Sequence, residues 1–510
     1  MNKLLIGNNA FEKVLTGARK IAEAVKLTLG PKGRNVLIER PHAEPLITND
    51  GVTIAREIKL ECPYESIGAQ VLREASIKTN LQAGEGTTTS IVLAEQILNT
   101  AARYIATGAS PVFIKEGLLA ATDYVVSQIE KSAKPISTIE NIRAIAINSC
   151  ANIVDGIIIA DAVSRVGAHG IITIDENKNG NTTLSFVDGL EVDAELASPY
   201  FCEDASTLST TFENAKIFIT SKTLNSIKEI LPILEECSRE KYPLVILADD
   251  YTPEVLSALV INKVRAGLRI CALKANFFGM HRDAILGDLA ALTEANIVTD
   301  LSDDEIKLGQ CDKIMMSMQN SKFISKKTKL LEERIKLIRA QLDATDDEYN
   351  KTRLGERLAG LTNGVAIISV GCTTEVEQKE KHLRIEDALA ATRAACEEGI
   401  VAGGGMTLLN TRKDLAKYIK TLPKTQVQGA QILFEVLDAP FRQICINSGA
   451  NPDLTLARIT KNQGYDARNR KYVDMFANGI VDPAKVVKCA LKNATSVAGT
   501  LLTTEGIVLQ

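Results

Sequence analysis

Apolar residues recur at steps of three and four positions through both ends of the chain, which is the period of a helix that buries one stripe. Phe11, Val14, Leu15 and Ala18 begin the first such run. A breaker cluster of sequence GPKG at residues 30–33 ends that helix. The helices predicted from this spacing cover about residues 11–28, 65–82, 88–107, 111–130, 139–148, 154–166, 426–448 and 484–499.

A different pattern occupies the middle of the chain. Residues 171–174 and 183–186 alternate like two paired strands, with Asn179-Gly180 between them as a turn signal. From about residue 188 to 365, strand-like and helical runs follow one another, which indicates an inserted α/β layer. The strand-like runs are 215–220, 244–248 and 270–274, the helical runs are 225–236, 253–264 and 282–293, and residues 326–361 predict a helical hairpin.

Two helices of this layer carry more apolar surface than one buried face requires. Their apolar residues are Ile227, Ile230, Leu231 and Leu234 in the first, and Val255, Leu256, Leu259, Val260 and Ile261 in the second. Broad apolar helices usually pack in a core, so burial is the simpler interpretation. An exposed surface that contacts another molecule is the alternative.

The sequence AGEGTTT at residues 83–89 leads directly into a predicted helix. Two glycines allow a tight turn, and the free N–H groups and the dipole of the next helix favour an anion, so the stretch is typical of a phosphate cradle. Glu85 lies between the glycines, and a carboxylate beside phosphate oxygens makes chemical sense when a hard cation such as Mg²⁺ lies between them. A polar helix N-cap without a ligand is the alternative.

Other predicted loops also contain small or acidic residues that could contact a ligand. The turn of residues 28–31 is either a plain corner or a loop that a flat ligand approaches closely. Asp50 begins an Asp-Gly pair, which suits a catalytic carboxylate and a simple hairpin turn equally well. Three glycines at 403–405 form either a helix stop or a bare strip of backbone for a ligand. Asp387 is predicted in the first turn of a helix that begins at Arg384.

Composition narrows the classes of function. At 510 residues the chain exceeds what one hydrophobic core usually supports, so two or three domains are expected. A net charge of −4, no tryptophan and 4% aromatic residues argue against a nucleic-acid surface. No apolar run reaches about 18 residues and the first residues do not resemble a signal peptide, so we expect a cytoplasmic protein without a membrane segment. The ten cysteines include no C-x-x-C pair, which argues against a disulfide framework or a zinc site.

Five motifs follow one another along the chain. They are TLGPKGRNV at residues 28–36, DGV at 50–52, GEGTTT at 84–89, EDALAATRA at 386–394 and GIVAGGG at 399–405. In order and spacing they resemble the group I chaperonins of the GroEL family, and the resemblance extends over almost the whole chain. Five separated motifs are far more specific than one glycine loop.

The resemblance implies a multidomain α and α/β subunit. A helical, ATP-binding equatorial domain would consist of residues 1–131 and 398–510. A small α/β intermediate hinge domain would consist of 132–187 and 366–397, and an inserted α/β apical domain that binds substrate would consist of 188–365. The pattern of helical blocks around a different middle section agrees with this order.

The same resemblance implies roles for individual residues. Those that would bind nucleotide are Thr28, Leu29, Gly30, Pro31, Asn49, Gly86, Thr87, Thr88, Thr89, Gly404 and Asp482. Among them Asp482, in the sequence GIVDP, would contact the sugar. Asp50 and Asp387 would be the catalytic carboxylates that position the attacking water, while Glu85 and Asp50 would hold the metal. The implied cofactors are ATP and Mg²⁺, with K⁺ as a further candidate cation.

An apolar rim is implied for the apical domain. Its residues would be Tyr200, Phe201, Leu231, Leu234, Leu256, Val260 and Ile261. Burial of apolar surface on such a rim contributes roughly 25 cal/mol per Å², and non-directional contacts suit a varied set of clients. The implied partners are non-native polypeptides, a co-chaperonin cap that accepts the same rim, and further copies of this chain in a heptameric ring that could pair as a weak double ring. Neither nucleic acid nor a membrane is an expected partner.

Departures from the family pattern bear on turnover and assembly. Glu85 stands where the family has an aspartate, and Asn49 where it has a lysine. Ala194 and Leu196 replace an arginine and a tyrosine of the family, and the loop NSGANP at 447–452 lacks the acidic residues of the ring-to-ring contact. These changes suggest a divergent paralogue.

Two functions therefore remain open. The first is an ATP-dependent chaperone that promotes the folding and refolding of polypeptides in an oligomeric ring, an ATPase with turnover attenuated by Glu85. The second is a chaperonin paralogue with weak or absent ATPase cycling that acts as a holdase or scaffold. A small-molecule kinase is disfavoured because no lysine follows the glycine loop.

Overall fold

The computed structural model describes residues 3–40, 45–136, 138–167, 170–177, 180–187, 189–204, 208–275, 279–299, 306–326, 328–345, 347–372, 374–460 and 463–509. The chain divides into two compact units. Unit 1 contains Met1–Ser164, Glu176–Thr183 and Ser369–Gln510, and unit 2 contains Arg165–Asp175 and Leu184–Ile368.

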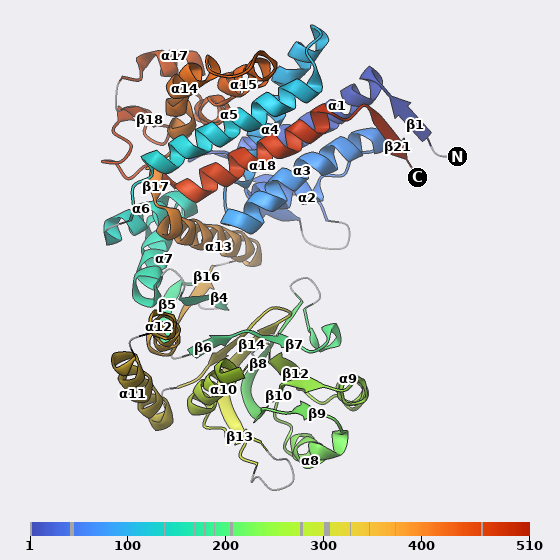
Figure 1. Ribbon diagram of the computed structural model, residues 1–510, viewed down its shortest axis with the longest axis vertical. Helices are drawn as coiled ribbons and strands as arrows, with labels where there is room; N and C mark the ends of the chain where they lie inside the picture. Colours follow the sequence, from blue (N-terminus) through green and yellow to red (C-terminus); the bar gives the residue numbers. More distant parts are fainter. Residues whose placement is uncertain are drawn as a thin grey trace. The chain divides into compact units, whose positions relative to one another are not determined.

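Long helices dominate unit 1. Figure 1 shows α18 lying along α3, α4 and α5, and these helices contact one another. The helices are α1 (Asn8–Val25), α2 (Gly51–Glu57), α3 (Pro63–Ala83), α4 (Thr87–Ala106), α5 (Pro111–Ser132), α6 (Ile139–Cys150), α7 (Ile153–Val166), α13 (Glu375–Glu398), α14 (Met406–Ile419), α15 (Lys424–Val436), α16 (Ala439–Asn447), α17 (Pro452–Arg458) and α18 (Ala484–Leu502). The apolar stripes of α1, α3, α4, α5, α15 and α18 meet in the largest core among the described residues of this unit, with side chains such as Ile21, Leu72, Ile97, Val125 and Leu491 fully buried.

Short antiparallel strand pairs accompany the helices of unit 1, and two of these pairs join distant parts of the chain. β1 (Lys3–Ile6) pairs with β21 (Gly506–Leu509), so the two ends of the chain lie side by side (Figure 1). The other pairs are β2 (Val36–Ile38) with β3 (Leu46–Thr48), β17 (Ile400–Ala402) with β20 (Val481–Pro483), and β18 (Gly464–Asp466) with β19 (Lys471–Val473).

A mixed sheet forms the centre of unit 2. Its strand order is β6-β15-β14-β8-β10-β12-β7, and β13 also pairs with β8. The strands are β6 (Gly189–Val192), β7 (Ala194–Leu196), β8 (Ser209–Thr220), β10 (Leu244–Ala248), β12 (Ile270–Ala275), β13 (Ile297–Val298), β14 (Gly309–Ser317) and β15 (Ser321–Ile324), with a separate parallel pair β9 (Thr223–Leu224) and β11 (Asp250–Tyr251). Every residue of β10 is buried, as expected for a parallel strand covered on both faces.

The helices of unit 2 are held by apolar burial, and three of them are also joined by a buried ion cluster. The helices are α8 (Leu231–Glu240), α9 (Pro253–Ala266), α10 (Gly279–Thr293), α11 (Lys329–Ala344) and α12 (Glu348–Asn363). Asp288 of α10 is almost fully buried and accepts hydrogen bonds from Arg334 of α11 and Arg357 of α12 at 2.7–2.8 Å. The cluster therefore ties the helical hairpin α11–α12 to α10.

The predicted fold class, helical blocks around an α/β section, is confirmed, but several local predictions are wrong. The strands β4 (Ile171–Asn177) and β5 (Thr183–Val187) do not pair with each other, because β16 (Val365–Gly371) lies between them. Asn179, the predicted turn residue, lies outside the described residues.

Helix boundaries also differ from the predictions where proline intervenes. The helix expected over 225–236 begins only at Leu231, after a 3-10 turn, and the helix expected over 426–448 is divided into α15 and α16. Pro232 and Pro440 each lie in the first turn of the later helix, where a proline is favoured because no intrahelical N–H bond is lost. The boundaries of the equatorial, intermediate and apical domains, which the resemblance implies, stay a prediction.

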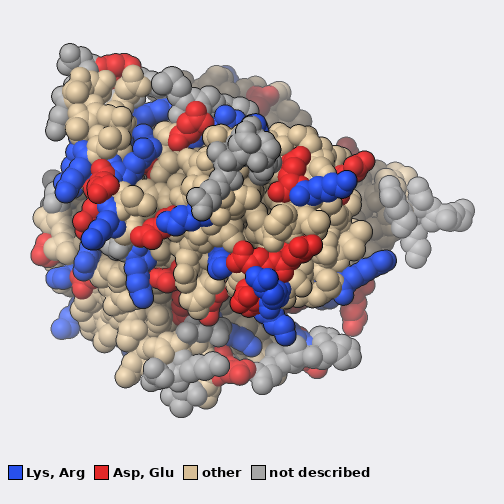
Figure 2. Space-filling view, turned by 90° about the horizontal axis from the view of Figure 1, so that it is seen from below, with Lys and Arg blue, Asp and Glu red and all other residues tan. Residues whose placement is uncertain are grey.

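Charged side chains of both signs are interspersed on the face drawn in Figure 2, so the described residues form no extended basic patch there. No helix in the described part of the chain is long and apolar enough to cross a membrane.

The crossing of α5 and α15 depends on two glycines and yields a first prediction. A Cβ atom on Gly429 would lie 2.1 Å from the carbonyl oxygen of Ile114, and one on Gly117 would lie 2.1 Å from that of Gln426. Gly429→Ala should therefore push the helices apart and lower the free energy of unfolding by about 1–3 kcal/mol. Thermal unfolding of the full chain measures the loss.

Gly355→Ala is the matched control, because Gly355 also lies in a helix but a Cβ there meets no atom within 4 Å. Alanine should be neutral or slightly stabilising at that position. An unchanged melting temperature for Gly429→Ala would show that the helix crossing tolerates a methyl group.

Candidate functional site

The glycine loop between α3 and α4 is held in a conformation that only glycine adopts easily. Gly84 ends α3 with φ 69° and Gly86 precedes α4 with φ 85°, both in the left-handed region. A Cβ on Gly84 would lie 2.1 Å from the Cβ of Ala390, and one on Gly86 would lie 2.7 Å from Val486 Cγ1. The loop is thus packed against α13 and α18, which fixes the direction in which α4 begins.

The first turn of α4 is prepared to receive an anion. Gly86 has no side chain and gives no cap hydrogen bond to the first N–H groups of this helix. Thr87 and Thr88 are buried there, and Thr89 is half-buried. Uncapped N–H groups together with the positive end of a 20-residue helix favour a phosphate group.

The turn of residues 28–31 lies beside this helix start. The hydroxyl oxygens of Thr28 and Thr88 are 3.1 Å apart, and since Thr28 donates its proton to the carbonyl of Val25, Thr88 is the donor of the pair. Gly30, with φ 85°, and Pro31 are exposed, while Leu29 is half-buried. The two segments predicted to hold phosphates are therefore in contact.

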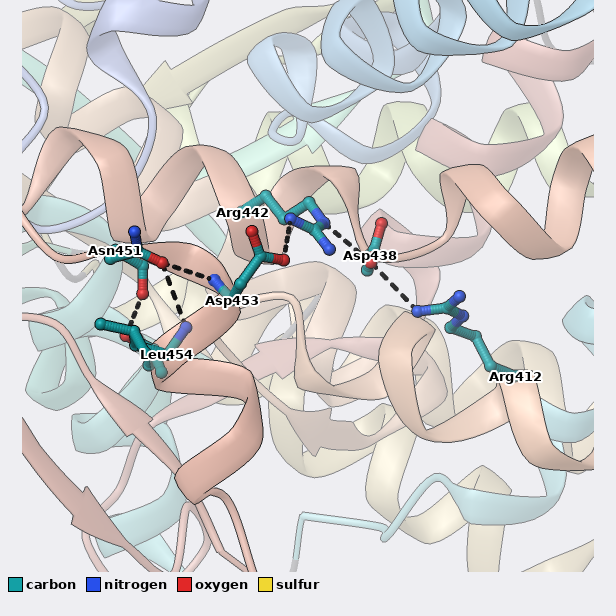
Figure 3. A network of polar contacts seen from close by, with 7 residues as sticks. Arg412, Asp438, Arg442, Asn451, Asp453 and Leu454 are labelled. Atoms are coloured by element: carbon teal, nitrogen blue, oxygen red, sulfur yellow. Dashed lines mark hydrogen bonds and ion pairs between the residues drawn. The ribbon is translucent and has the colours of Figure 1, made fainter.

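Asn447, which the sequence marked only as part of the loop 447–452 and not for this site, holds this turn from α16. Its Nδ2 atom donates to the carbonyl oxygens of Lys26 and Leu29 at 2.9 and 2.8 Å. Figure 3 shows how α16 is fixed in turn: Asp438 accepts from Arg412 and Arg442. Arg442 also pairs with an aspartate of α17, whose first turn is capped by Asn451.

Asp50 is the N-cap of α2, so the simple hairpin alternative is wrong. Its carboxylate accepts hydrogen bonds from the N–H groups of Val52 and Thr53 and from the Thr53 hydroxyl. The Thr87 hydroxyl lies 3.4 Å from Asp50 Oδ1, and a Cβ on Gly51 would lie 2.5 Å from Thr88 Oγ1. α2 therefore begins directly against the first turn of α4. Asn49, just before it, is exposed.

Asp387 lies in the middle of α13, not in the first turn of a helix. The prediction failed because α13 begins earlier, where Thr374 caps it. Burial raises the pKa of Asp387 well above its usual range, and the charges of Asp50 and then Glu85 raise it further. Like charges act strongly only at short range, so these carboxylates share one site.

Glu85 is held by a residue from α6. The Ser149 hydroxyl donates to Glu85 Oε1 at 2.6 Å, and burial raises the pKa of Glu85 although this hydrogen bond opposes the shift. No local pattern marked Ser149, because it lies 64 positions from its partner.

Asp482 and the glycine triplet face each other across the β17–β20 pair. The N–H of Gly403 donates to the carbonyl oxygen of Ile480 at 3.0 Å. Burial, and then the charge of Glu85, raise the pKa of Asp482 to about 7, while a hydrogen bond from the N–H of Gly404 lowers it. Gly404 has φ 64°, and a Cβ there would lie 3.3 Å from Met475 Cε. The triplet is a turn with bare backbone between β17 and α14.

This arrangement fits a nucleotide phosphate with a divalent cation. Half-buried carboxylates with raised pKa values lie near a helix start that favours an anion, and a hard cation would reconcile the two. In the described residues no three or more His, Cys, Asp and Glu side chains form a complete metal site. Phosphate oxygens would have to complete the coordination, as is usual for Mg²⁺.

A comparison with protein-family models identifies the family of this chain. The model of the TCP-1/cpn60 chaperonin family matches residues 21–510. The chain belongs to this family. The chaperonin resemblance seen in the five motifs is therefore confirmed.

A solved structure agrees with this assignment at the level of the fold. The crystal structure of the chaperonin gp146 from the bacteriophage EL 2 (Pseudomonas aeruginosa), in the presence of ATP-BeFx, matches with a TM-score of 0.70 and 20% sequence identity. The match covers 99% of each chain. The similarity in fold therefore extends over almost the whole chain and not over one domain alone.

The predicted rim residues of this chaperonin divide by exposure. Tyr200, Ile261 and Leu231 are exposed by 74%, 51% and 43%, and Leu256 and Val260 are half-buried. Val264, which the sequence prediction missed, is exposed on α9 three positions after Ile261. The Lys263 ammonium group donates to the carbonyl of residue 201 at 2.6 Å, so α9 lies beside the turn that carries Tyr200.

The expected exposure of Phe201 and Leu234 is wrong. Phe201 is fully buried and Leu234 is 5% exposed, and both pack in the core of unit 2. Leu234 lies on the stripe of α8 that also buries Ile233 and Cys237, because helical residues three and four positions apart share a face. For these two positions the core interpretation holds.

The raised pKa of Asp482 gives a pH prediction. A carboxyl group whose folded pKa is about 7, against roughly 4 when unfolded, stabilises the fold fully below pH 4 and loses that contribution as pH rises to about 7. Asp482→Asn should therefore raise the melting temperature little at pH 4 and increasingly up to pH 7, with no further gain above it. Thermal unfolding of the nucleotide-free chain across pH 4–8 measures the difference, and a gain that does not depend on pH would contradict the burial of this carboxylate.

Proposed function

We propose that this chaperonin is an ATP-driven chaperone that binds non-native polypeptides and promotes their folding. The observation that carries the proposal is the convergence of the glycine loop, the Thr28 turn and the carboxylates of Asp50, Glu85 and Asp387 on the first turn of α4. These residues come from both ends of unit 1. A plain N-cap of α4 would require neither the Thr28 turn nor the three carboxylates.

The site supports a division of roles toward the nucleotide. The Thr28–Pro31 turn and residues Gly86–Thr89 would hold the phosphates, whereas Gly404 and Asp482 would contact the nucleoside. Glu85 and Asp50 would hold Mg²⁺, and K⁺ is a further candidate. The chaperonin gp146 was crystallised in the presence of ATP-BeFx, which supports nucleotide binding in a protein of this fold.

Hydrolysis would depend on the orientation of two carboxylates. Asp387 would accept a proton from the attacking water once its carboxyl group is ionised. Bound Mg²⁺ would neutralise charge on the phosphates and favour the ionised form of the carboxylates around it. Asp50 is fixed by hydrogen bonds from the first turn of α2, so it can act without rearrangement.

Client binding would use the exposed apolar residues of unit 2. Tyr200, Leu231 and Ile261 supply most of this surface, with Leu256 and Val260 at its inner edge. α9 contacts the 3-10 turn before α8, so the two helices are neighbours. Non-native chains, and a co-chaperonin cap, would bury their own apolar surface there.

Assembly and location are proposed from the family. We place the chain in a homo-oligomeric, heptameric ring in the cytoplasm, with the domain boundaries given by the sequence. Asn451, which belongs to the loop without acidic residues, caps α17 within its own subunit. This intramolecular role is consistent with a weak contact between rings.

A holdase or scaffold without productive cycling is the second candidate. The observation that favours it is Glu85, whose side chain is one methylene longer than the aspartate that the resemblance implies at this position. The two candidates differ in ATP turnover, whereas both require client binding.

Asp387→Ala tests the chemistry. We expect kcat for ATP hydrolysis to fall by about 10²–10⁴-fold, because an oriented proton acceptor contributes that much, while ATP affinity changes only a few-fold. Steady-state ATPase rates give kcat and equilibrium binding gives the ATP affinity, and both are measured with and without an unfolded client.

Glu386→Ala is the control, since Glu386 is the exposed neighbour on the same helix and should leave kcat intact. Equal losses of binding and turnover in Asp387→Ala would contradict the catalytic role. A wild-type chain that binds ATP and clients but does not hydrolyse ATP would favour the holdase.

Ile261→Ser and Leu234→Ser test the client surface as a pair. Ile261→Ser, at the exposed position, should abolish capture of a denatured client and change the stability by no more than about ±0.5 kcal/mol. The buried position should lose roughly 2–5 kcal/mol of stability through the cavity it leaves. Thermal unfolding and client capture by the full chain measure both effects.

Leu81→Ser is the control for the client surface, because Leu81 is 79% exposed on α3, outside the predicted rim. It should change neither measurement. Full capture by Ile261→Ser would remove this residue from the client surface.

A further inference from the structure

We propose that Ser149 is a positioning residue for the Glu85 carboxylate, and that this pair adapts the phosphate loop to an acid one methylene longer than the family's aspartate. The inference rests on the proposed function, since it assigns Ser149 a part in holding the metal-bound nucleotide. Neither the motifs nor the family match assigns a role to Ser149.

The first support is the contact itself. The Ser149 hydroxyl donates to Glu85 Oε1 at 2.6 Å, a short bond of the kind that charged acceptors make. No hydrogen bond to Oε2 is found in the described part of the chain. One oxygen is therefore fixed by the protein while the other remains available to a ligand.

The second support is that α6 is itself fixed. Ile145 of α6 is buried in a small core with residues of α13, β17 and β20. One residue before Ser149, the Asn148 side-chain amide donates to the carbonyl oxygen of Gly479. Ser149 is thus held by the elements that carry Asp387 and Asp482.

The third support is the length of the Glu85 side chain. A glutamate side chain has more rotatable bonds than an aspartate, and without an anchor it would lose more entropy on ordering. The Ser149 hydroxyl supplies that anchor, and a shorter aspartate at position 85 would not reach it.

The test is a double-mutant cycle read by metal binding, not by turnover. The variants are Ser149→Ala, Glu85→Asp and the combination, and the measurement is ADP affinity in Mg²⁺ and in EDTA. Ser149→Ala should weaken the Mg²⁺-dependent part of the affinity by about 10-fold, as for a partner that orients a metal ligand, and leave the EDTA value unchanged. In the Glu85→Asp background, Ser149→Ala should have no effect.

Two further variants separate positioning from a general loss of structure. Ser149→Thr keeps the hydroxyl and should keep the Mg²⁺ dependence. Ser127→Ala removes a similar helix-borne hydroxyl, which donates to the carbonyl of Tyr124 and not to Glu85, and should change nothing.

The outcomes distinguish this inference from the proposed function. Ser149→Ala could weaken the Mg²⁺-dependent ADP affinity equally in the wild-type chain and in the Glu85→Asp variant. That result would overturn the positioning role of Ser149 but not the proposed function. An unchanged Mg²⁺ dependence in Ser149→Ala would do the same. A wild-type chain that binds no nucleotide under either condition would overturn the proposed function and this inference with it.

Discussion

Carboxylates of Asp50, Glu85, Asp387 and Asp482 crowd around the start of one helix, and the rest of unit 1 is arranged to hold them there. Like charges repel, and burial strengthens the repulsion because water is not available to screen it. Burial raises the pKa values of Glu85, Asp387 and Asp482, and neighbouring carboxylates raise those of Asp387 and Asp482 further. A ligand that carries both a phosphate group and a cation would match the anion-favouring helix start and the acidic side chains together.

Tight backbone packing holds the site against that repulsion. Ala390 of α13 and Val486 of α18 press on the two glycines of the loop, so neither can move without displacing a long helix. Asn447 and Ser149 then hold the Thr28 turn and Glu85 from two other helices. Pre-organised groups of this kind are what phosphoryl transfer needs, since the protein contributes mainly position and charge.

The parts of the structure that could be predicted are those whose signals are local. The helical period of residues 65–82 appears as α3, and short motifs marked Asp50 and Glu85, which the structure brings into one site. The failures arise from distant residues: β16 separates β4 from β5 although it follows them far along the chain. The roles of Ser149 and Asn447 in this site also escaped prediction, because both residues reach it through long-range hydrogen bonds, which leave no pattern in the sequence around them.

The position of α18 has a consequence for synthesis of the chain. This helix packs against α3, α4 and α5, so the core of unit 1 cannot be complete before residue 502 has left the ribosome. Unit 2, formed mainly by the continuous stretch Leu184–Ile368, has no such requirement and can fold while the last third is still being made. Until α18 arrives, the nascent chain exposes the apolar faces of α3, α4 and α5, so the protein passes through the very state that its own family exists to bind.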